Sequence, residues 1–172
     1  MVAAGMPVLA LIAVLRGRRS GSKLARAMAD GAYNRAFAPN RTDFDWLSTD
    51  KAEVDAYCAD PLCGMLCSSG FYSDLAAGLW RIHRRRAIEN IRKDLPLYIF
   101  CGGRDPVGDM GKSPAVLARL YRRAGIRDVQ LVLYPEARHE TFNDVCRDEA
   151  VSALLSWILK KTGTQNAAGT ED

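Results

Sequence analysis

Asp105 and His139 are the two side chains of this sequence whose types and surroundings could carry chemistry together. Asp105 lies in the segment GGRDPVG (102–108), and His139 lies in PEARHE (135–140). A carboxylate that accepts a hydrogen bond from imidazole Nδ1 fixes the tautomer of the ring and stabilises the imidazolium formed when Nε2 takes a proton. The two residues therefore predict an acid–histidine pair able to activate a nucleophile, which these segments leave unspecified.

Each of the two residues also has a simpler interpretation. Asp-Pro after two glycines is an ordinary turn, and a single histidine at the start of a loop is commonly just a polar loop residue. GGRDPVG has the glycine content of a phosphate cradle, but it lacks the GK[ST] ending of a P-loop. The pair is more informative than either member because both residues follow directly after a predicted strand.

The part of the chain that must position this pair alternates between strand and helix patterns. The expected elements are a strand at 95–101, a helix at 113–124, a strand at 129–134 and a helix at 144–160. Both strands are continuous apolar runs, typical of strands buried on both faces of a parallel sheet. Adjacent parallel strands lie about 5 Å apart, and functional groups of such sheets lie on loops at the carboxyl ends. The pattern therefore predicts an α/β fold in which Asp105 and His139 can meet.

The part of the chain before these strands shows helical patterns only. Helices are expected at 6–16, 22–37, 50–59 and 71–91. Asp50 and Glu53 form an acidic version of a capping box at the start of the third helix. The expected organisation is thus an all-helical segment 1–92, a βαβα part 93–161 and a disordered tail 162–172.

The composition indicates a globular protein: 48% of the residues are hydrophobic and 26% are charged. The net charge of +4 is too small to demand a polyanionic partner, and no nucleic-acid-binding motif is present. We interpret the arginine clusters as solvated helix faces. They consist of Arg16, Arg18 and Arg19, and of Arg81, Arg84, Arg85 and Arg86.

The five cysteines lack the paired CxxC spacing of a zinc site. They are Cys58, Cys63, Cys67, Cys101 and Cys146. We therefore expect reduced cysteines in a cytoplasmic protein that uses no metal and no cofactor.

The apolar run 2–15 is too short to span a bilayer, and its arginines follow it instead of preceding it as in a signal peptide. A buried or capping helix is the expected structure. The alternative is an interfacial helix whose arginines face lipid headgroups.

Several blocks of the sequence resemble one enzyme family. They are Asn34 with Phe37, RTDFDWLSTD (41–50), DAYCADPLCG (55–64), GGRDPVG (102–108) and LYPEARHETFND (133–144). Together they resemble the C-terminal half of α/β-hydrolases of the lysophospholipase and monoacylglycerol-lipase type, classed with the S33 serine aminopeptidases. The resemblance covers about 9–160 and implies that residues 1–92 are a helical cap or lid. It further implies that Asp105 and His139 are the second and third members of a Ser–Asp–His triad.

The nucleophile that this family requires is not found in the sequence. The family's serine lies in a GxSxG elbow between a strand and a helix, upstream of the cap. No GxSxG occurs here, and in Gly17–Gly21 the serine, Ser20, is fourth instead of third. Cys101, Ser68 and Ser69 are alternatives, but none lies on a predicted strand–turn–helix elbow. Thr49, where the family has arginine, is a smaller departure.

Three functional hypotheses follow from the resemblance. In the first, the chain is the cap and C-terminal part of a split or truncated serine hydrolase that acts on small ester or lipid substrates, with its N-terminal half missing. An acyl pocket lined by Phe44, Trp46, Leu47, Phe71 and Leu75 is expected in that case. The second hypothesis is a non-catalytic remnant that binds a partner protein or an apolar ligand, and the third is a membrane-surface protein. Two parallel strands cannot bury both faces with so few helices, so we also expect poor solubility of the isolated chain.

Overall fold

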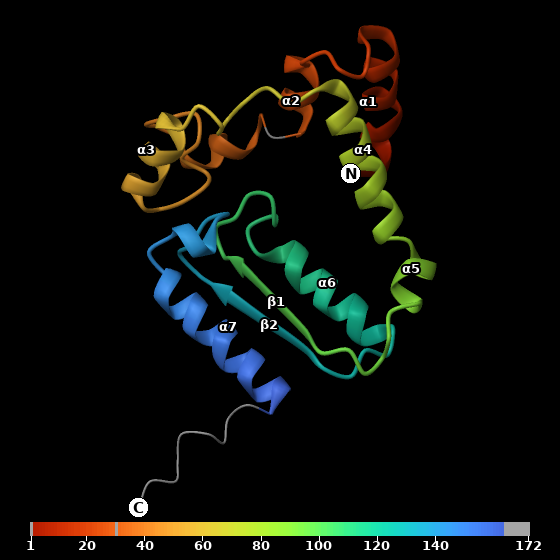
Figure 1. Ribbon diagram of the computed structural model, residues 1–172, viewed down its shortest axis with the longest axis vertical. Coiled ribbons are helices and arrows are strands. Elements are labelled where there is room, and N and C mark those ends of the chain that lie inside the picture. The colour runs from red at the N-terminus through yellow and green to blue at the C-terminus, as the bar shows by residue number, and fades with distance from the viewer. Residues whose placement is uncertain (1, 30, 164–172) are drawn as a thin grey trace, which may run out of the picture. The chain divides into compact units, whose positions relative to one another are not determined.

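The computed structural model describes residues 2–29 and 31–163, which form two compact units (Figure 1). The first unit comprises residues 1–44 and 55–91, and the second comprises residues 45–54 and 92–172. The expected all-helical segment 1–92 differs from the first unit in one stretch, because residues 45–54 are part of the second unit. The rest of the expected tail, 164–172, lies outside the described residues.

The first unit is built from α-helices joined by turns. Its elements are α1 (Val2–Arg16), α2 (Lys23–Ala29), a 3₁₀ helix (Tyr33–Phe37), the later part of α3 (Lys51–Ala59), α4 (Ser69–Ile82) and α5 (Arg85–Glu89). Helices α1 and α4 lie side by side (Figure 1). Leu9, Ala25, Tyr72 and Ala76 form the buried apolar cluster of this unit.

Two of the predicted helices are interrupted. The helix expected at 22–37 is wrong as a single element, because α2 ends at Ala29 and the 3₁₀ helix is separate. Within that 3₁₀ helix, the side chain of Asn34 donates to the carbonyl of Thr42 at 2.7 Å and so ties it to the following loop. The helix expected at 71–91 begins earlier, capped by Ser68, and ends at Ile82. Its C-cap residue His83 places Nδ1 2.7 Å from the carbonyl oxygen of Leu79, and α5 then begins separately.

The second unit contains a two-stranded parallel sheet between two helices. Its elements are β1 (Leu97–Gly102), α6 (Lys112–Arg123), β2 (Val129–Tyr134), a 3₁₀ helix (Thr141–Asn143) and α7 (Arg147–Thr162). Leu97 pairs with Val129 and Gly102 with Tyr134, so the carboxyl ends of both strands coincide. Helices α6 and α7 lie on opposite sides of the strands (Figure 1). The predicted α/β class and strand–helix–strand order are confirmed.

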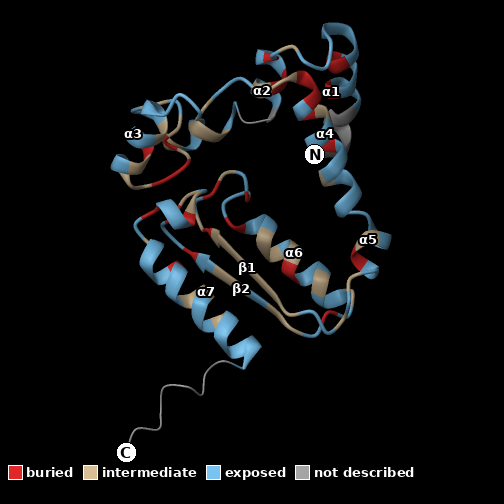
Figure 2. Cartoon of the chain, viewed as in Figure 1, coloured by how far each residue is buried: buried red, intermediate tan, exposed pale blue. Residues whose placement is uncertain are grey.

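The strands are less buried than their apolar sequences predict. Only Gly102 and Tyr134 are buried, whereas the other strand residues are intermediate or exposed (Figure 2). Two strands and two helices bury the apolar cluster of Tyr134, Ala137 and Ala150, but each strand has only one neighbour within the described residues. The limited burial agrees with the expectation that two parallel strands cannot bury both faces with so few helices.

Candidate active site

The loops that follow β1 and β2 are joined to each other by backbone hydrogen bonds. The amide of Gly103 donates to the carbonyl of Tyr134 at 2.7 Å, and the amide of Arg104 donates to that of Ala137 at 2.9 Å. A Cβ atom on Gly102 would lie 2.0 Å from the carbonyl oxygen of Arg138, so only glycine permits this approach. The close packing of the two loops brings the residues after each strand together.

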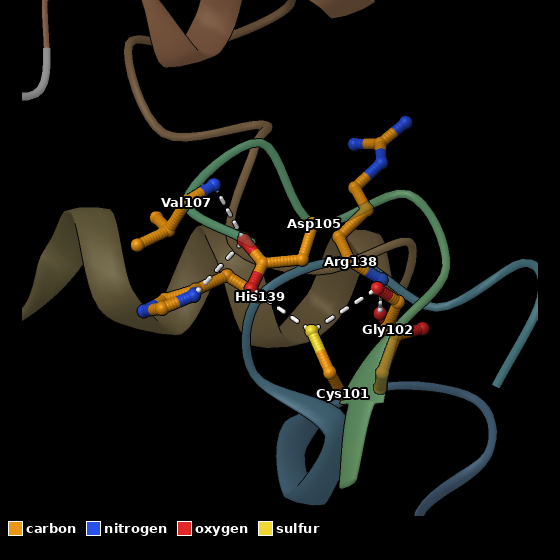
Figure 3. A network of polar contacts seen from close by, with 7 residues as sticks. Cys101, Gly102, Asp105, Val107, Arg138 and His139 are labelled. Atoms are coloured by element: carbon orange, nitrogen blue, oxygen red, sulfur yellow. Dashed lines mark hydrogen bonds and ion pairs between the residues drawn. The ribbon is translucent and has the colours of Figure 1, made fainter. Parts of the chain in front are cut away.

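Asp105 and His139 form a direct contact at this point (Figure 3). Oδ1 of Asp105 lies 3.1 Å from Nδ1 of His139 and also accepts from the amide of Val107 at 2.8 Å. The second oxygen, Oδ2, accepts from Sγ of Cys101 at 3.3 Å. The Asp105 side chain is 7% exposed and that of His139 is 36% exposed. The carboxylate is thus buried and held from three sides, while the imidazole is open to solvent.

The surroundings of Asp105 favour its charged form. Burial opposes ionisation, but the hydrogen bond and the charge interaction with His139 outweigh it, assisted by the Val107 amide and the Cys101 thiol. The pKa of the Asp105 carboxyl therefore lies below its ordinary value. An ionised carboxylate bonded to Nδ1 leaves Nε2 as the basic nitrogen of a neutral imidazole.

Cys101 behaves as a hydrogen-bond donor and not as a nucleophile. Burial, the main cause, and the neighbouring charge of Asp105 raise the pKa of the Cys101 thiol to about 12. Because the thiolate is the nucleophilic form, a thiol that stays protonated at neutral pH is poorly reactive. This environment fits the structural interpretation of Cys101 as a buried strand residue.

His139 is also contacted by an aromatic ring from residues far upstream. The centroids of the Trp46 and His139 rings are 5.2 Å apart, with an interplanar angle of 40°. Among the described residues, no hydrogen-bond partner contacts Nε2 of His139, so this nitrogen is free to accept a proton. The imidazole is therefore held at Nδ1 by Asp105 and on its face by Trp46.

Residues 45–50 are fastened to the His139 loop by several hydrogen bonds. The Arg138 guanidinium donates to the carbonyls of Asp45 and Ser48, and the amide of Glu140 donates to the carbonyl of Leu47 at 2.8 Å. The carboxylate of Asp144, 4% exposed, accepts from the amide and hydroxyl of Thr49. It also accepts from the amides of Arg138 and Val145, at 2.9 and 2.8 Å.

A hollow of about 450 Å³ lies beside the Asp105–His139 pair. It is lined by Phe100, Cys101, Asp105, His139, Glu140, Thr141, Phe142 and Asn143. Phe100 and Phe142 pack against each other there, with their ring centroids 4.9 Å apart. The pair therefore faces a space with an apolar floor that a reacting group could enter.

The five residues expected to line an acyl pocket are divided between the two units. Trp46 and Leu47 are in the second unit, where Leu47 is buried and Trp46 contacts His139. Phe44, Phe71 and Leu75 are in the first unit. Phe71 and Leu75 are half exposed on α4, and Phe44 packs against Tyr57 at 4.9 Å. Their role in substrate binding stays a prediction.

The sequence patterns did not predict that Arg138, Asp144 and Thr49 join residues 45–50 to the His139 loop by hydrogen bonds. The blocks RTDFDWLSTD and LYPEARHETFND contain all of them, but nothing in either block indicates that the two meet. Among the described residues, no group of three His, Cys, Asp or Glu side chains is placed to hold a metal ion. The polar side chains Asp105, His139 and Cys101 are instead hydrogen-bonded to one another.

One known family matches most of this chain. The family model described as serine aminopeptidase, S33, matches residues 6–145. The chain therefore belongs to this family and has part of an α/β-hydrolase fold. No curated protein matches the chain.

Solved structures with the same fold include three esterases and lipases. A thermostable carboxyl esterase from Bacillus coagulans, in complex with glycerol, superposes with a TM-score of 0.83 at 22% identity over 91% of this chain. A lipase in an open form gives 0.70 at 24% identity over 90%, and a monoglyceride lipase from Saccharomyces cerevisiae gives 0.63 at 21% identity over 91%. The matches cover 51%, 50% and 49% of those chains, so this chain spans about half their length.

The helices offer no membrane-spanning segment within the described ranges. None of them combines the length and the apolar character needed to cross a bilayer.

Proposed function

We propose that this chain is the cap and C-terminal part of a serine hydrolase that cleaves small carboxylic esters. The contact between Asp105 Oδ1 and His139 Nδ1 carries the proposal, because it supplies an oriented base beside an open hollow. In this role His139 takes the proton of the attacking serine and returns it to the leaving alcohol, and Asp105 stabilises the imidazolium. The serine comes from a segment outside these 172 residues, since the sequence contains no GxSxG.

The names of the similar structures and the exposed apolar side chains of α4 support a proposal for the substrate class. Two of them are named a carboxyl esterase and a monoglyceride lipase. Monoacylglycerols and lysophospholipids are therefore the proposed substrates, with the exposed Phe71 and Leu75 of α4 contributing to an acyl-binding surface. The two side chains lie four residues apart and share one face of the helix. The cytoplasm is the proposed compartment, because all five cysteines are free thiols.

A fluorophosphonate probe, which labels activated serines, tests this proposal. We expect no labelling of the chain alone, and labelling together with hydrolysis of a short p-nitrophenyl ester when it is co-expressed with its upstream polypeptide. His139→Gln should lower the rate by about 10³–10⁴-fold. His83→Gln is the matched control, because His83 is the other histidine of the chain and lies at the end of α4. Equal loss in both variants, or no activity in the complex, would contradict the proposal.

A second role, binding at a lipid surface, is favoured by one feature of α1. Val14 and Leu15 are 78% and 74% exposed and are followed directly by Arg16 and the nearby Arg19. Apolar side chains beside arginines suit the boundary between acyl chains and anionic headgroups. Co-sedimentation with phosphatidylserine vesicles tests this role: Leu15→Glu should abolish binding, whereas unchanged binding would contradict it.

A further inference from the structure

Trp46 lies on His139 although the two residues are far apart in the sequence. The rings are 5.2 Å apart at 40°, and residues 45–54 belong to the same compact unit as β1 and β2. The rest of the helical segment around them forms the other unit. Residues 45–50, expected in the cap, are therefore structurally part of the candidate site.

The imidazole of His139 needs a second support besides Asp105. One hydrogen bond at Nδ1 fixes the position of one ring atom, but it leaves the ring able to swing about that contact. With a 36% exposed side chain, His139 is not enclosed by its own loop. A flat ring packed on the imidazole face restricts this motion, because aromatic pairs prefer a limited set of geometries.

Trp46 itself is held at the correct place by its neighbours on both sides. Arg138 donates to the carbonyls of Asp45 and Ser48, so the guanidinium of the residue before His139 brackets the Trp46 position. The hydroxyl of Ser48 donates to the carbonyl of Asn143 at 2.6 Å. Thr49 is bonded through its amide and its hydroxyl to the buried carboxylate of Asp144. These bonds all join 45–50 to the loop that carries His139, and none involves Asp105.

We propose that Trp46 is a positioning residue for His139, and that the bonds of Arg138 and Asp144 to residues 45–50 fasten it there. This inference rests on the proposed function for its consequence in catalysis, but the positioning can be measured without catalysis. The expected consequence in the hydrolase is a single imidazole orientation with Nε2 aimed at the incoming serine.

Histidine NMR of the full 172-residue chain tests the positioning directly. The chain has only two histidines, so labelling histidine with ¹⁵N gives two imidazole systems, and His83 serves as the internal control. We expect a single Nδ1–H tautomer for His139 and ring protons shifted upfield by the Trp46 ring current. In Trp46→Ala the upfield shift should vanish, and a ring that swings far enough to break its Nδ1 contact with Asp105 should average the two tautomers, while the His83 signals stay unchanged. Trp46→Phe should retain the tautomer and part of the shift.

Two further variants separate the fastening bonds from general stability. Thr49→Val removes the hydroxyl bond to Asp144, and we expect it to reduce the His139 shift. Arg147→Gln is the matched control, because the Arg147–Glu53 pair at 3.8 Å also joins this segment to α7 without touching the His139 loop. An equal effect of both variants would overturn the fastening. If Trp46→Ala fails to fold, the wild type and Trp46→Phe decide the question. The positioning is overturned if the His139 ring protons show no upfield shift in either protein.

The catalytic consequence is measured in the complex with the upstream polypeptide. Trp46→Ala should lower kcat for ester hydrolysis about tenfold with little change in KM, and Trp46→Phe should recover most of it. A wild-type chain that shows the NMR signature but gives no hydrolysis in the complex would refute the proposed function and leave the positioning intact. Hydrolysis in the complex with His139 signals indifferent to Trp46 would refute the positioning alone.

Discussion

The two units of this chain bury different kinds of side chain. The first unit buries an apolar cluster of Leu9, Ala25, Tyr72 and Ala76, and its buried polar side chains, Ser22 and Ser69, are uncharged. The second unit buries three carboxylates, those of Asp45, Asp105 and Asp144, beside a smaller apolar cluster. Burying a charge is unfavourable unless it is fully hydrogen-bonded. The second unit therefore depends on specific polar partners, whereas the first depends on the packing of apolar surface.

Two of the three buried carboxylates, those of Asp105 and Asp144, belong to the candidate site and its supporting hydrogen bonds. Asp105 is buried with donors on both oxygens, and Asp144 accepts from four donors, three of them backbone amides. In the first unit the Asp74 carboxylate instead pairs with Arg18 at the surface, where the side chains are 69% and 59% exposed. Substitutions matched between the two units test this contrast. Their effects can be followed in urea through Trp157 of α7 and Trp80 of α4.

The largest effect is expected at Gly102. In Gly102→Ala the new Cβ would lie 2.0 Å from the carbonyl oxygen of Arg138, and a backbone atom cannot move away cheaply. We expect the free energy of unfolding of the second unit to fall by about 3–5 kcal/mol. Gly78 in α4 is the matched control, because nothing lies within 4 Å of its added Cβ. Gly78→Ala should stabilise the first unit by about 0.5–1 kcal/mol, and similar effects at both positions would remove the contrast.

The next largest effect is expected at Asp144. Asp144→Ala leaves the part-buried amides of Thr49, Arg138 and Val145 without their acceptor. We expect a loss of about 2–3 kcal/mol in the unfolding free energy of the second unit. Asp74→Ala, which breaks only a solvent-exposed ion pair, should cost less than about 1 kcal/mol. A larger loss at Asp74 than at Asp144 would contradict the comparison.

The third prediction concerns the contribution of Asp105 to stability at low pH. Because the pKa of Asp105 is lower in the folded chain than its ordinary value of 3.8, the ionised carboxylate stabilises the fold at all pH values above about 3.8. This contribution should be lost progressively as the pH falls below 3.8 towards the lower folded-state pKa. Urea unfolding measured from pH 6 to pH 2.5 should show this slope in the wild type and a shallower slope in Asp105→Asn. Identical slopes would show that Asp105 is not stabilised in its charged form.

The smallest effect is expected at Cys101. Cys101→Ala removes the thiol donor to Asp105 Oδ2 and a partly buried sulfur atom, so about 1 kcal/mol should be lost from the second unit. Cys58, exposed on α3, is the control, and Cys58→Ala should change stability by less than about 0.5 kcal/mol. Iodoacetamide at pH 8 should also modify Cys58 much faster than Cys101, whose pKa is raised to about 12. Faster modification of Cys101 would refute the donor role.

Local sequence patterns predicted the elements around the site well. The apolar runs ending at Cys101 and Tyr134, with Gly125 after the intervening helix, indicated a strand–helix–strand unit, and the strands are parallel as expected. The meeting of Asp105 and His139 followed from strand geometry, because the carboxyl ends of adjacent parallel strands must coincide. Patterns failed at helix ends, because periodicity continues past Ala29 and Ile82, where α2 and α4 end. Local hydrogen bonds compete with the helix there, as in the contact of His83 Nδ1 with the carbonyl of Leu79.

The part of the site that could not be predicted depends on contacts between distant segments. DWLSTD (45–50) has no periodicity that connects it to 137–144, and its residues look like the end of a loop before a helix. The bonds from Thr49 to Asp144 and from Arg138 to Ser48 join residues 95 and 90 positions apart. Hydrogen-bonding groups of this kind can find partners anywhere in the chain, so their partners become visible only in three dimensions.

The separation between residues 45–50 and the His139 loop has a consequence for the order of folding. In the sequence, residues 55–91 of the first unit lie between the two segments that must meet. Closing a loop of more than 90 residues has a larger entropic cost than closing local turns, and such contacts form late. During synthesis, residues 45–50 leave the ribosome long before Arg138 and Asp144 exist. The contacts between residues 45–50 and the His139 loop should therefore be the last in the second unit to form during folding. They should also be the first to open in denaturant or on heating.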